Sequence, residues 1–215
     1  MPLYKRWKDN NAEWAVWKVT ETDEELLRRL SENLSYAEEL ARLRSSARRT
    51  EYLAVRVLLK TLLGRECEIA HHPSGKPYLP DAGLHVTISH TCGYVSVGIH
   101  PDREVGMDIE QRTHRVERVK NYFLHADEMQ EFEALPPNDM LDWLLLHWSA
   151  KETMFKILDR EGVSLRQHFR ILPFVLHAEG TMNGLETFTG KEHAFAIKYF
   201  ITPHFVCTWC TSLLP

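Results

Sequence analysis

Alternation of apolar and polar side chains predicts a short strand at residues 104–110. Because successive side chains of a strand point to opposite faces, its apolar residues share one face, and Asp108 and Glu110 share the other. Two neighbouring carboxylates repel each other, so burial of this pair requires a cation or a proton. The strand therefore places two acidic side chains where their charge must be neutralised.

A longer amphipathic pattern predicts a helix from Asp139 to about Leu158, with Asn138 as its N-cap. At about 100° per residue, one face of this helix is an apolar stripe. Its members are Leu141, Leu144, Leu145, Trp148 and Phe155. Glu152 falls within the stripe, and a charge at a position that the pattern assigns to the core marks a candidate functional residue.

The two elements together supply three carboxylates, those of Asp108, Glu110 and Glu152. Oxygen ligands of this kind suit a hard divalent cation, and we expect Mg²⁺ acting on a phosphate. Lys156 follows Glu152 by one helical turn, so the two side chains share a helix face. That spacing also suits an ordinary exposed ion pair, but the place of Glu152 in the apolar stripe favours a functional role.

The rest of the chain repeats an order of helices followed by strands in both halves, with a boundary near residues 101–104. Thr22 and Glu25 form a capping box that opens one helix, and Gly64 ends another at its C′ position. The other predicted elements are strands at 13–19, 84–89, 94–99, 169–176, 185–189, 194–201 and 205–212, and helical stretches at 22–30, 35–44, 47–63 and 114–135, the last broken near His125. This pattern predicts an α/β (α+β) fold.

Length and composition exclude several classes of protein. A chain of 215 residues is long enough to bury a real core. It has no apolar run long enough for a membrane span, and its N-terminus lacks the apolar segment of a signal peptide, so we expect a cytoplasmic location. The formal net charge of −4 argues against nucleic acid as the main partner.

Basic side chains form a second group of candidates. Arg49 and Arg56 lie two helical turns apart and share a face, and the planar guanidinium of arginine binds phosphate oxygens through two hydrogen bonds. The same arginines could instead be exposed and paired with Glu51 and its neighbours. Lys76 lies in the loop Gly75-Lys76-Pro77 and offers a point charge to a phosphate, although most lysines in such loops are simply solvated.

Four ordered motifs resemble the 4′-phosphopantetheinyl transferase superfamily. The paired signature is G-M-D-I-E at residues 106–110 and W-S-A-K-E-T-M-F-K at residues 148–156. Upstream, Gly75-Lys76-Pro77 and Ile88-Ser89-His90 are similar to two further motifs of the surfactin-type (Sfp-type) branch. The resemblance extends from about Ala47 to Leu165.

The resemblance implies a fold of two similar subdomains related by a pseudo-twofold axis, each an antiparallel sheet packed with helices. It places the active site in the cleft between them. Residues 1–103 would form the N-terminal subdomain that binds the nucleotide of coenzyme A, and residues 104–215 the C-terminal subdomain with the acidic residues and the W-S-x-K-E helix. Because both halves lie on one chain, we expect a monomer.

The activity implied is Mg²⁺-dependent transfer of 4′-phosphopantetheine from coenzyme A to a serine of an apo acyl or peptidyl carrier protein, with release of 3′,5′-ADP. This is holo-[acyl-carrier-protein] synthase activity. Asp108, Glu110 and Glu152 would bind the metal, and Lys156 would reach a phosphate, with Lys151 as a second candidate. The motifs fit fatty acid, polyketide and peptide-synthetase carriers equally.

The resemblance also assigns the nucleotide-binding residues. Arg49 is the best match to the arginine that meets the 3′-phosphate of coenzyme A, and Arg48 is its nearest rival. The other expected phosphate-binding residues are Arg56, Lys76, Ser89 and His90. Carrier proteins of this family are usually acidic, so a basic and apolar docking patch is expected, and it is predicted around Arg115, Arg118, Lys120, Phe123 and Leu124.

Several alternatives stay open. The general base that activates the serine is either Glu152 or a metal-bound water, because a carboxylate bound directly to Mg²⁺ is a weaker base. The same residues would also serve an Mg²⁺-dependent hydrolase of the coenzyme A pyrophosphate. A non-catalytic module that binds coenzyme A or a carrier protein is a third possibility, although intact Asp108, Glu110, Glu152 and Lys156 argue against it.

Overall fold

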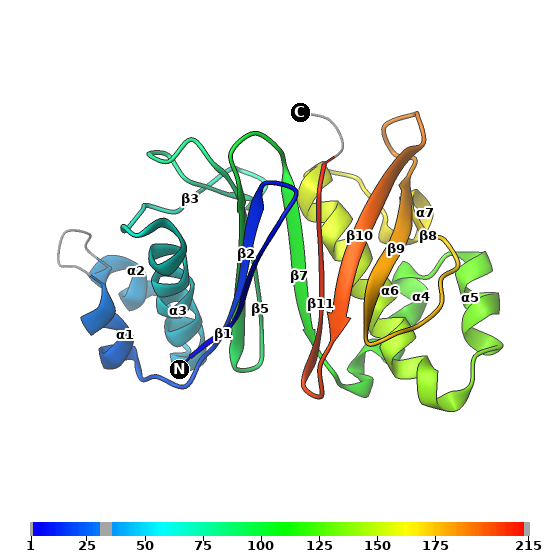
Figure 1. The fold of residues 1–215 in the computed structure, drawn as a ribbon, viewed down its shortest axis with the longest axis horizontal. Helices are drawn as coiled ribbons and strands as arrows, with labels where there is room; N and C mark the ends of the chain where they lie inside the picture. The colour runs from blue at the N-terminus through cyan, green and yellow to red at the C-terminus, as the bar shows by residue number, and fades with distance from the viewer. Residues whose placement is uncertain (1, 31–35, 213–215) are drawn as a thin grey trace. The chain divides into compact units, whose positions relative to one another are not determined.

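The computed structural model describes residues 2–30 and 36–212. The chain folds as two compact units, residues 1–102 and 103–215. Each unit is an antiparallel sheet packed with helices (Figure 1). This confirms the mixed α/β class expected from the sequence, whereas the expected cleft stays a prediction.

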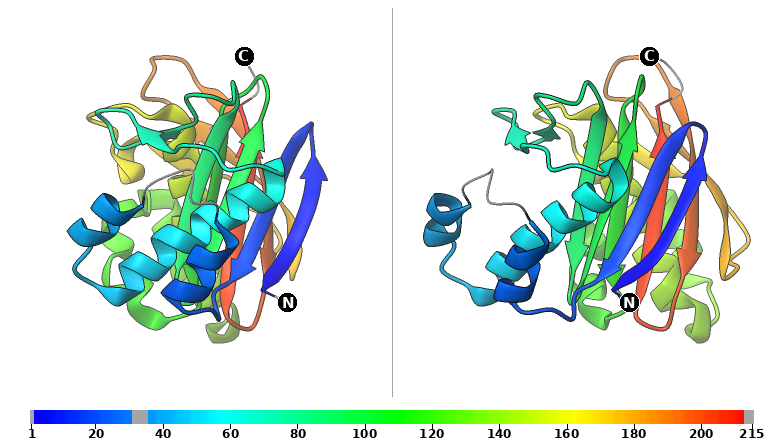
Figure 2. Two further views of the ribbon diagram at one scale, coloured as in Figure 1. Left: turned by 90° about the vertical axis from the view of Figure 1, so that its left-hand side faces the viewer. Right: turned by 60° about the vertical axis from the view of Figure 1, so that its left-hand side comes forward.

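The first unit contains a four-stranded antiparallel sheet with the order β1-β2-β6-β5. Its strands are β1 (Leu3–Asp9), β2 (Ala12–Lys18), β5 (His85–Thr91) and β6 (Tyr94–His100). The helices are α1 (Asp23–Arg29), α2 (Ala37–Arg42) and α3 (Ser46–Leu63), and a small pair of strands is formed by β3 (Ala70–His71) and β4 (Pro77–Tyr78). Helix α3 packs against β2 and β6, so it covers one face of this sheet (Figure 2).

Local signals in the first unit explain where these helices begin and end. The capping box predicted at the start of α1 is confirmed, because Thr22 Oγ1 accepts a hydrogen bond from the Glu25 amide at 3.3 Å and Glu25 Oε2 accepts one from the Thr22 amide at 2.9 Å. Gly64 ends α3 with φ of 72°, a left-handed conformation that glycine adopts without steric cost.

The second unit contains a five-stranded antiparallel sheet with the order β7-β11-β10-β9-β8. Its strands are β7 (Val105–Gln111), β8 (Phe169–Ile171), β9 (Glu179–Glu186), β10 (His193–Ile201) and β11 (Phe205–Thr211). The helices are η1 (His114–Arg118), α4 (Lys120–Phe123), α5 (Ala126–Glu133), α6 (Pro137–Leu158) and α7 (Leu165–His168). The long helix α6 packs across β7 and β11 and carries much of the core.

Three local predictions in this unit are wrong. The strand expected at residues 169–176 is shorter, because β8 ends at Ile171. Asn138 is not the N-cap of α6, because the helix begins at Pro137, which suits the first helical position through its fixed φ and its missing amide hydrogen. Residues 187–189 are not strand, because β9 ends at Glu186, whose buried carboxylate accepts hydrogen bonds from the Thr189 amide and hydroxyl at 2.8 and 2.9 Å. None of the helices in the described part of the chain is both long and apolar enough to cross a membrane.

Gly106 marks the closest approach of α6 to β7. A Cβ atom at this position would lie 2.2 Å from the Thr153 carbonyl oxygen and 2.9 Å from Ile157 Cγ1. Such distances are far below van der Waals contact, so any side chain here forces the helix away from the strand. Gly106 therefore sets the separation between the two elements that carry the acidic residues.

We expect Gly106→Ala to destabilise the protein by about 3 kcal/mol, because the added methyl group overpacks a backbone contact. Urea unfolding measures this loss. Gly83→Ala is the control, since its Cβ meets open space and only the left-handed φ of 61° is penalised, at about 1 kcal/mol. Equal losses in the two variants would contradict the steric role of Gly106.

Candidate functional site

Strand β7 and helix α6 place acidic and basic side chains side by side in the second unit. Gly106, Asp108 and Glu110 share one face of β7 because side chains alternate, and this is the face on which α6 packs at Gly106. Lys156 Nζ lies 2.8 Å from Asp108 Oδ1 and also donates a hydrogen bond to the Met107 carbonyl at 2.9 Å. Asp108 is only 4% exposed, so this ion pair is largely shielded from water.

Another residue of α6, Trp148, holds the side chain of Glu110. The indole Nε1 of Trp148 donates a hydrogen bond to Glu110 Oε1 at 2.8 Å. The Trp148 ring in turn packs edge-to-face on Phe123, with 5.2 Å between the ring centroids. A packed aromatic residue therefore fixes the orientation of one of the three predicted metal ligands.

The electrostatics show that the three acids interact. Burial raises the pKa of Glu110 to about 7, and repulsion by Asp108 and Glu152 adds to this, while the Trp148 hydrogen bond and Lys156 oppose it. Burial likewise raises the pKa of Glu152 to about 7, again with repulsion by Asp108 and opposition from Lys156. The acids therefore share a region of negative potential that one lysine only partly neutralises.

A metal site is not assembled in this geometry. Among residues 2–30 and 36–212, no three or more His, Cys, Asp or Glu side chains are grouped in a way that could hold a metal ion. The donors nevertheless fit a hard cation chemically, because Asp108, Glu110 and Glu152 offer oxygen ligands only, and their mutual repulsion is what a divalent ion would relieve. Mg²⁺ binding at these residues is thus a proposal.

Buried hydroxyl groups, which the sequence reasoning missed, fix α6 against β11. Thr208 Oγ1 lies 2.9 Å from Ser149 Oγ and 2.7 Å from Thr153 Oγ1, and all three side chains are fully buried. Thr208 pairs with Asp108 across the sheet, so the cluster sits beside the acidic residues. The sequence signal that could have predicted this cluster is the presence of Ser and Thr at otherwise apolar positions of the helix and the strand.

Lys151 lies in the core. Its side chain is fully buried, and Nζ donates to Glu128 Oε2 and to the Phe123 carbonyl, both at 2.6 Å. Glu128 also accepts hydrogen bonds from the His125 and Ile171 amides, at 2.6 and 2.7 Å. Burial lowers the pKa of Lys151, and the charge of Glu128 opposes that shift. This placement favours a structural role for Lys151 over the predicted contact with a phosphate.

We expect Lys151→Met to destabilise the protein by about 3–5 kcal/mol, because it leaves the Glu128 carboxylate buried without its counter-ion. Adding Glu128→Gln should recover part of this loss, since the amide oxygen can still accept the backbone hydrogen bonds without carrying charge. Urea unfolding of both variants checks the expectation. A double variant no more stable than the single one would show that the charge imbalance is not the cause.

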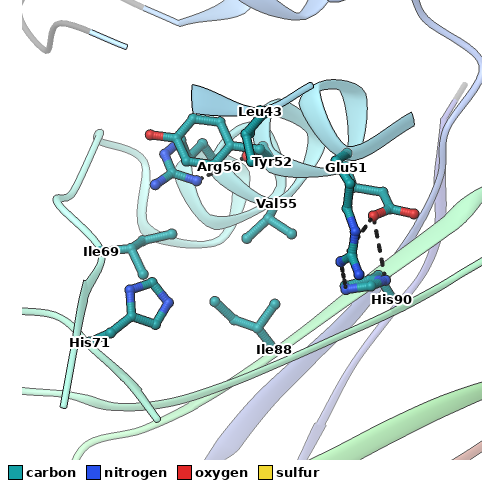
Figure 3. A pocket seen from close by; sticks show the side chains of 10 residues that line it. Leu43, Glu51, Tyr52, Val55, Arg56, Ile69, His71, Ile88 and His90 are labelled. Atoms are coloured by element: carbon teal, nitrogen blue, oxygen red, sulfur yellow. Dashed lines mark hydrogen bonds and ion pairs between the residues drawn. The ribbon is translucent and has the colours of Figure 1, made fainter. Parts of the chain in front are cut away.

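The first unit contains a pocket of about 260 Å³ beneath α3 (Figure 3). Residues of α3, β3, β5 and the segment before α3 line it, namely Leu43, Arg48, Glu51, Tyr52, Val55, Arg56, Ile69, His71, Ile88 and His90. Apolar side chains form its floor, and Arg48, Arg56, His71 and His90 supply nitrogen donors. This composition suits a ligand with a flat apolar part and an anionic group.

Arg48, and not Arg49, faces this pocket. Arg48 Nη1 lies 3.1 Å from His90 Nε2, whereas Arg49 is held by Asp23 Oδ2 at 3.3 Å and by the Leu43 carbonyl at 3.2 Å. Adjacent helical residues point about 100° apart, so only one of the two can face β5. The geometry therefore favours Arg48 over the best match inferred from the sequence.

Arg56 lies against an aromatic side chain. Its guanidinium carbon is 3.2 Å from the Tyr52 ring centroid and 5.8 Å from that of Tyr36. Burial lowers the pKa of Arg56. A partly buried guanidinium on the pocket wall adds to the positive potential that an anion would meet.

The remaining predicted nucleotide-binding residues lie outside the pocket lining. Lys76 is in the loop between β3 and β4, where its carbonyl accepts a hydrogen bond from the His72 amide at 2.9 Å. Ser89 is buried in β5, next to His90 but on the opposite face of the strand. Their roles toward phosphate stay predictions.

The predicted carrier-docking patch needs one correction. Phe123 and Leu124 are fully buried in the core of the second unit, so they cannot form a surface. The neighbouring Tyr122 is 76% exposed, and Arg115 and Arg118 are also exposed. The short helix α4 turns position 123 inward and position 122 outward, a rotation that composition alone does not reveal.

The comparison with known protein families gives a match in the second unit. Residues 104–210 match the family model of the 4′-phosphopantetheinyl transferase superfamily. The match covers most of the second unit, supports that superfamily and indicates a transferase of the phosphopantetheinyl type. No curated protein matches the chain.

Proposed function

We propose that the protein transfers 4′-phosphopantetheine from coenzyme A to a serine hydroxyl of an apo carrier protein and releases 3′,5′-ADP. The observation that carries this proposal is the electrostatic interaction among Asp108, Glu110, Glu152 and Lys156 within the segment that matches the superfamily. The motifs Gly75-Lys76-Pro77 and Ile88-Ser89-His90 in the first unit support the surfactin-type branch. Two sheet-and-helix units on one chain support a monomer.

The proposed reaction is an exchange of bonds at one phosphorus. The serine oxygen bonds to the β-phosphorus of coenzyme A, the bond from that phosphorus to the bridging oxygen breaks, and 3′,5′-ADP leaves with this oxygen. Asp108, Glu110 and Glu152 would hold Mg²⁺, which would supply charge neutralisation for the pyrophosphate oxygens. Lys156 adds a second positive charge, and Asp108 holds its amine in place at 2.8 Å.

Glu152 is proposed as the acceptor of the serine proton. An effective general base has a pKa near the working pH, and burial together with Asp108 raises that of Glu152 to about 7 in the protein without metal. Direct binding to Mg²⁺ would lower this pKa, so the role requires that Glu152 is not bound to the metal when it accepts the proton. Lys156, one turn further along α6, opposes this shift and so keeps part of the Glu152 population ionised near neutral pH. A water molecule in the site remains the competing base.

The other partners follow from charge. Arg48, Arg56 and His90 are proposed to hold phosphate groups of the nucleotide in the pocket of the first unit. Exposed Arg115 and Arg118 beside Tyr122 offer a basic and aromatic surface in the second unit, which would suit an acidic carrier protein.

Intact-protein mass spectrometry tests the proposed transfer. An apo carrier protein mixed with coenzyme A and Mg²⁺ should gain one phosphopantetheine, and a chelator should prevent the gain. Asp108→Ala should lower turnover on the order of a hundredfold or more, because it removes both a metal ligand and the partner of Lys156. Glu133→Ala, at an exposed position of α5, is the matched control and should keep full activity.

Other outcomes of that experiment select the rival functions. Cleavage of coenzyme A while several carriers stay unmodified would establish the hydrolase. Binding of carrier or coenzyme A without any change of mass, and with the same affinity in Asp108→Ala, would establish the non-catalytic module.

Mg²⁺ binding should strengthen as the pH rises from about 6 to 8. The pKa values of Glu110 and Glu152 are raised to about 7, so without metal the folded protein retains protons that the unfolded chain loses near pH 4.5. Because of these raised pKa values, the metal-free protein loses stability as the pH rises from about 4.5 to about 7. A bound cation would offset this loss by neutralising the ionised carboxylates. The gain in melting temperature on adding Mg²⁺ should therefore be larger at pH 8 than at pH 6.

Glu152→Gln isolates this effect, because the amide keeps the shape of the side chain without the charge. Its Mg²⁺-dependent gain in melting temperature should be smaller and vary less with pH. A gain that is independent of pH in the unsubstituted protein would place the metal elsewhere.

A further inference from the structure

The pocket of the first unit holds an acidic residue among its cationic side chains. Glu51 Oε2 lies 3.7 Å from Arg48 Nη1 and 3.6 Å from His90 Nδ1, and Figure 3 shows its side chain pointing at His90. In the described part of the chain this oxygen is buried and accepts no hydrogen bond. A buried carboxylate oxygen without a donor is costly, so its position calls for a physical reason.

The contact between Arg48 and His90 supplies part of that reason. A guanidinium can only donate, so His90 Nε2 at 3.1 Å must be the acceptor, and the neutral ring then carries its proton on Nδ1. The Nδ1 side of the ring faces Glu51. The carboxylate therefore favours the one tautomer that lets Arg48 and His90 meet.

The exposure of these residues supplies the rest. The Arg48 side chain is 63% exposed, whereas that of Glu51 is 25% exposed. A long exposed arginine loses considerable rotamer freedom when it is held in one place. Glu51, one turn away on α3, attracts Arg48 toward the pocket and so limits the orientations that its side chain samples.

We propose that Glu51 is a positioning residue that holds Arg48 and His90 in a single orientation suited to binding a phosphate group. The inference rests on the proposed use of this pocket for the nucleotide of coenzyme A. Glu51 itself does not contact the phosphate; it prepares the two donors, so its removal lowers affinity through them. In a variant without Glu51, the side chains of Arg48 and His90 would have to be ordered when the phosphate binds, and this ordering costs binding free energy.

Isothermal titration calorimetry with 3′,5′-ADP tests this role. Glu51→Ala should weaken binding about tenfold, and Glu51→Gln should weaken it by a similar factor if charge rather than shape positions the donors. Glu24→Ala, at an exposed position of α1, should leave the affinity unchanged. If Glu51→Ala lowers the melting temperature strongly, the affinity for 3′,5′-ADP is compared between Glu51→Gln and the unsubstituted protein instead.

A double-mutant cycle separates positioning from a general structural effect. In an Arg48→Ala/His90→Ala background, Glu51→Ala should cause no further loss, because the residues through which it acts are gone. Nitrogen-15 spectra of the His90 ring add an independent readout. They should show the Nδ1-protonated tautomer in the unsubstituted protein and a mixture of tautomers in Glu51→Ala.

Each result bears on a different claim. Tighter binding by Glu51→Ala would overturn the inference, because Glu51 would then compete with the phosphate. Equal affinity in the unsubstituted and Glu51→Ala proteins would overturn it while leaving the proposed transfer intact. Carrier modification without measurable 3′,5′-ADP binding would also overturn it, and absence of both would overturn the proposed function as well.

Discussion

The contact between α6 and β7 at Gly106 is the constraint on which the second unit depends. A Cβ atom at position 106 would lie 2.2 Å from the Thr153 carbonyl oxygen, so only glycine allows the helix this close to the strand. The hydroxyl contacts of Ser149, Thr153 and Thr208 then fix the helix against β11. With both elements fixed, Lys156 reaches Asp108.

This packing buries the polar face of β7, which carries Asp108 and Glu110. The buried carboxylates repel one another and Glu152. Asp108 is paired with Lys156, but Glu110 and Glu152 are left with pKa values raised to about 7 by burial and by neighbouring acids. Apolar residues at these positions would give a more stable core. The retained charge suits the cation proposed for these residues.

The sequence predicted most of the longer helices and strands, although not β1, and it predicted the shared face of Asp108 and Glu110, because alternation is a local property. It could not place Lys151 in the core, since its counter-ion Glu128 lies on another helix, 23 residues away in the chain. Nor could it separate Arg48 from Arg49, because a shift of one residue rotates a side chain by about 100°, and the strand that decides between them is distant in the sequence. Such choices require tertiary contacts.

The candidate residues of the two units differ in charge: those of the second unit are mainly acidic, and those of the first are mainly basic. Burial and mutual repulsion raise the pKa values of Glu110 and Glu152 in the second unit, and a cation would relieve this repulsion. The arginines and His90 of the first unit present donors suited to an anion. A phosphate-containing substrate would suit the donors of the first unit, and a divalent metal would suit the acids of the second. The reaction proposed above needs both chemistries, because coenzyme A supplies the phosphate groups and Mg²⁺ would supply the positive charge.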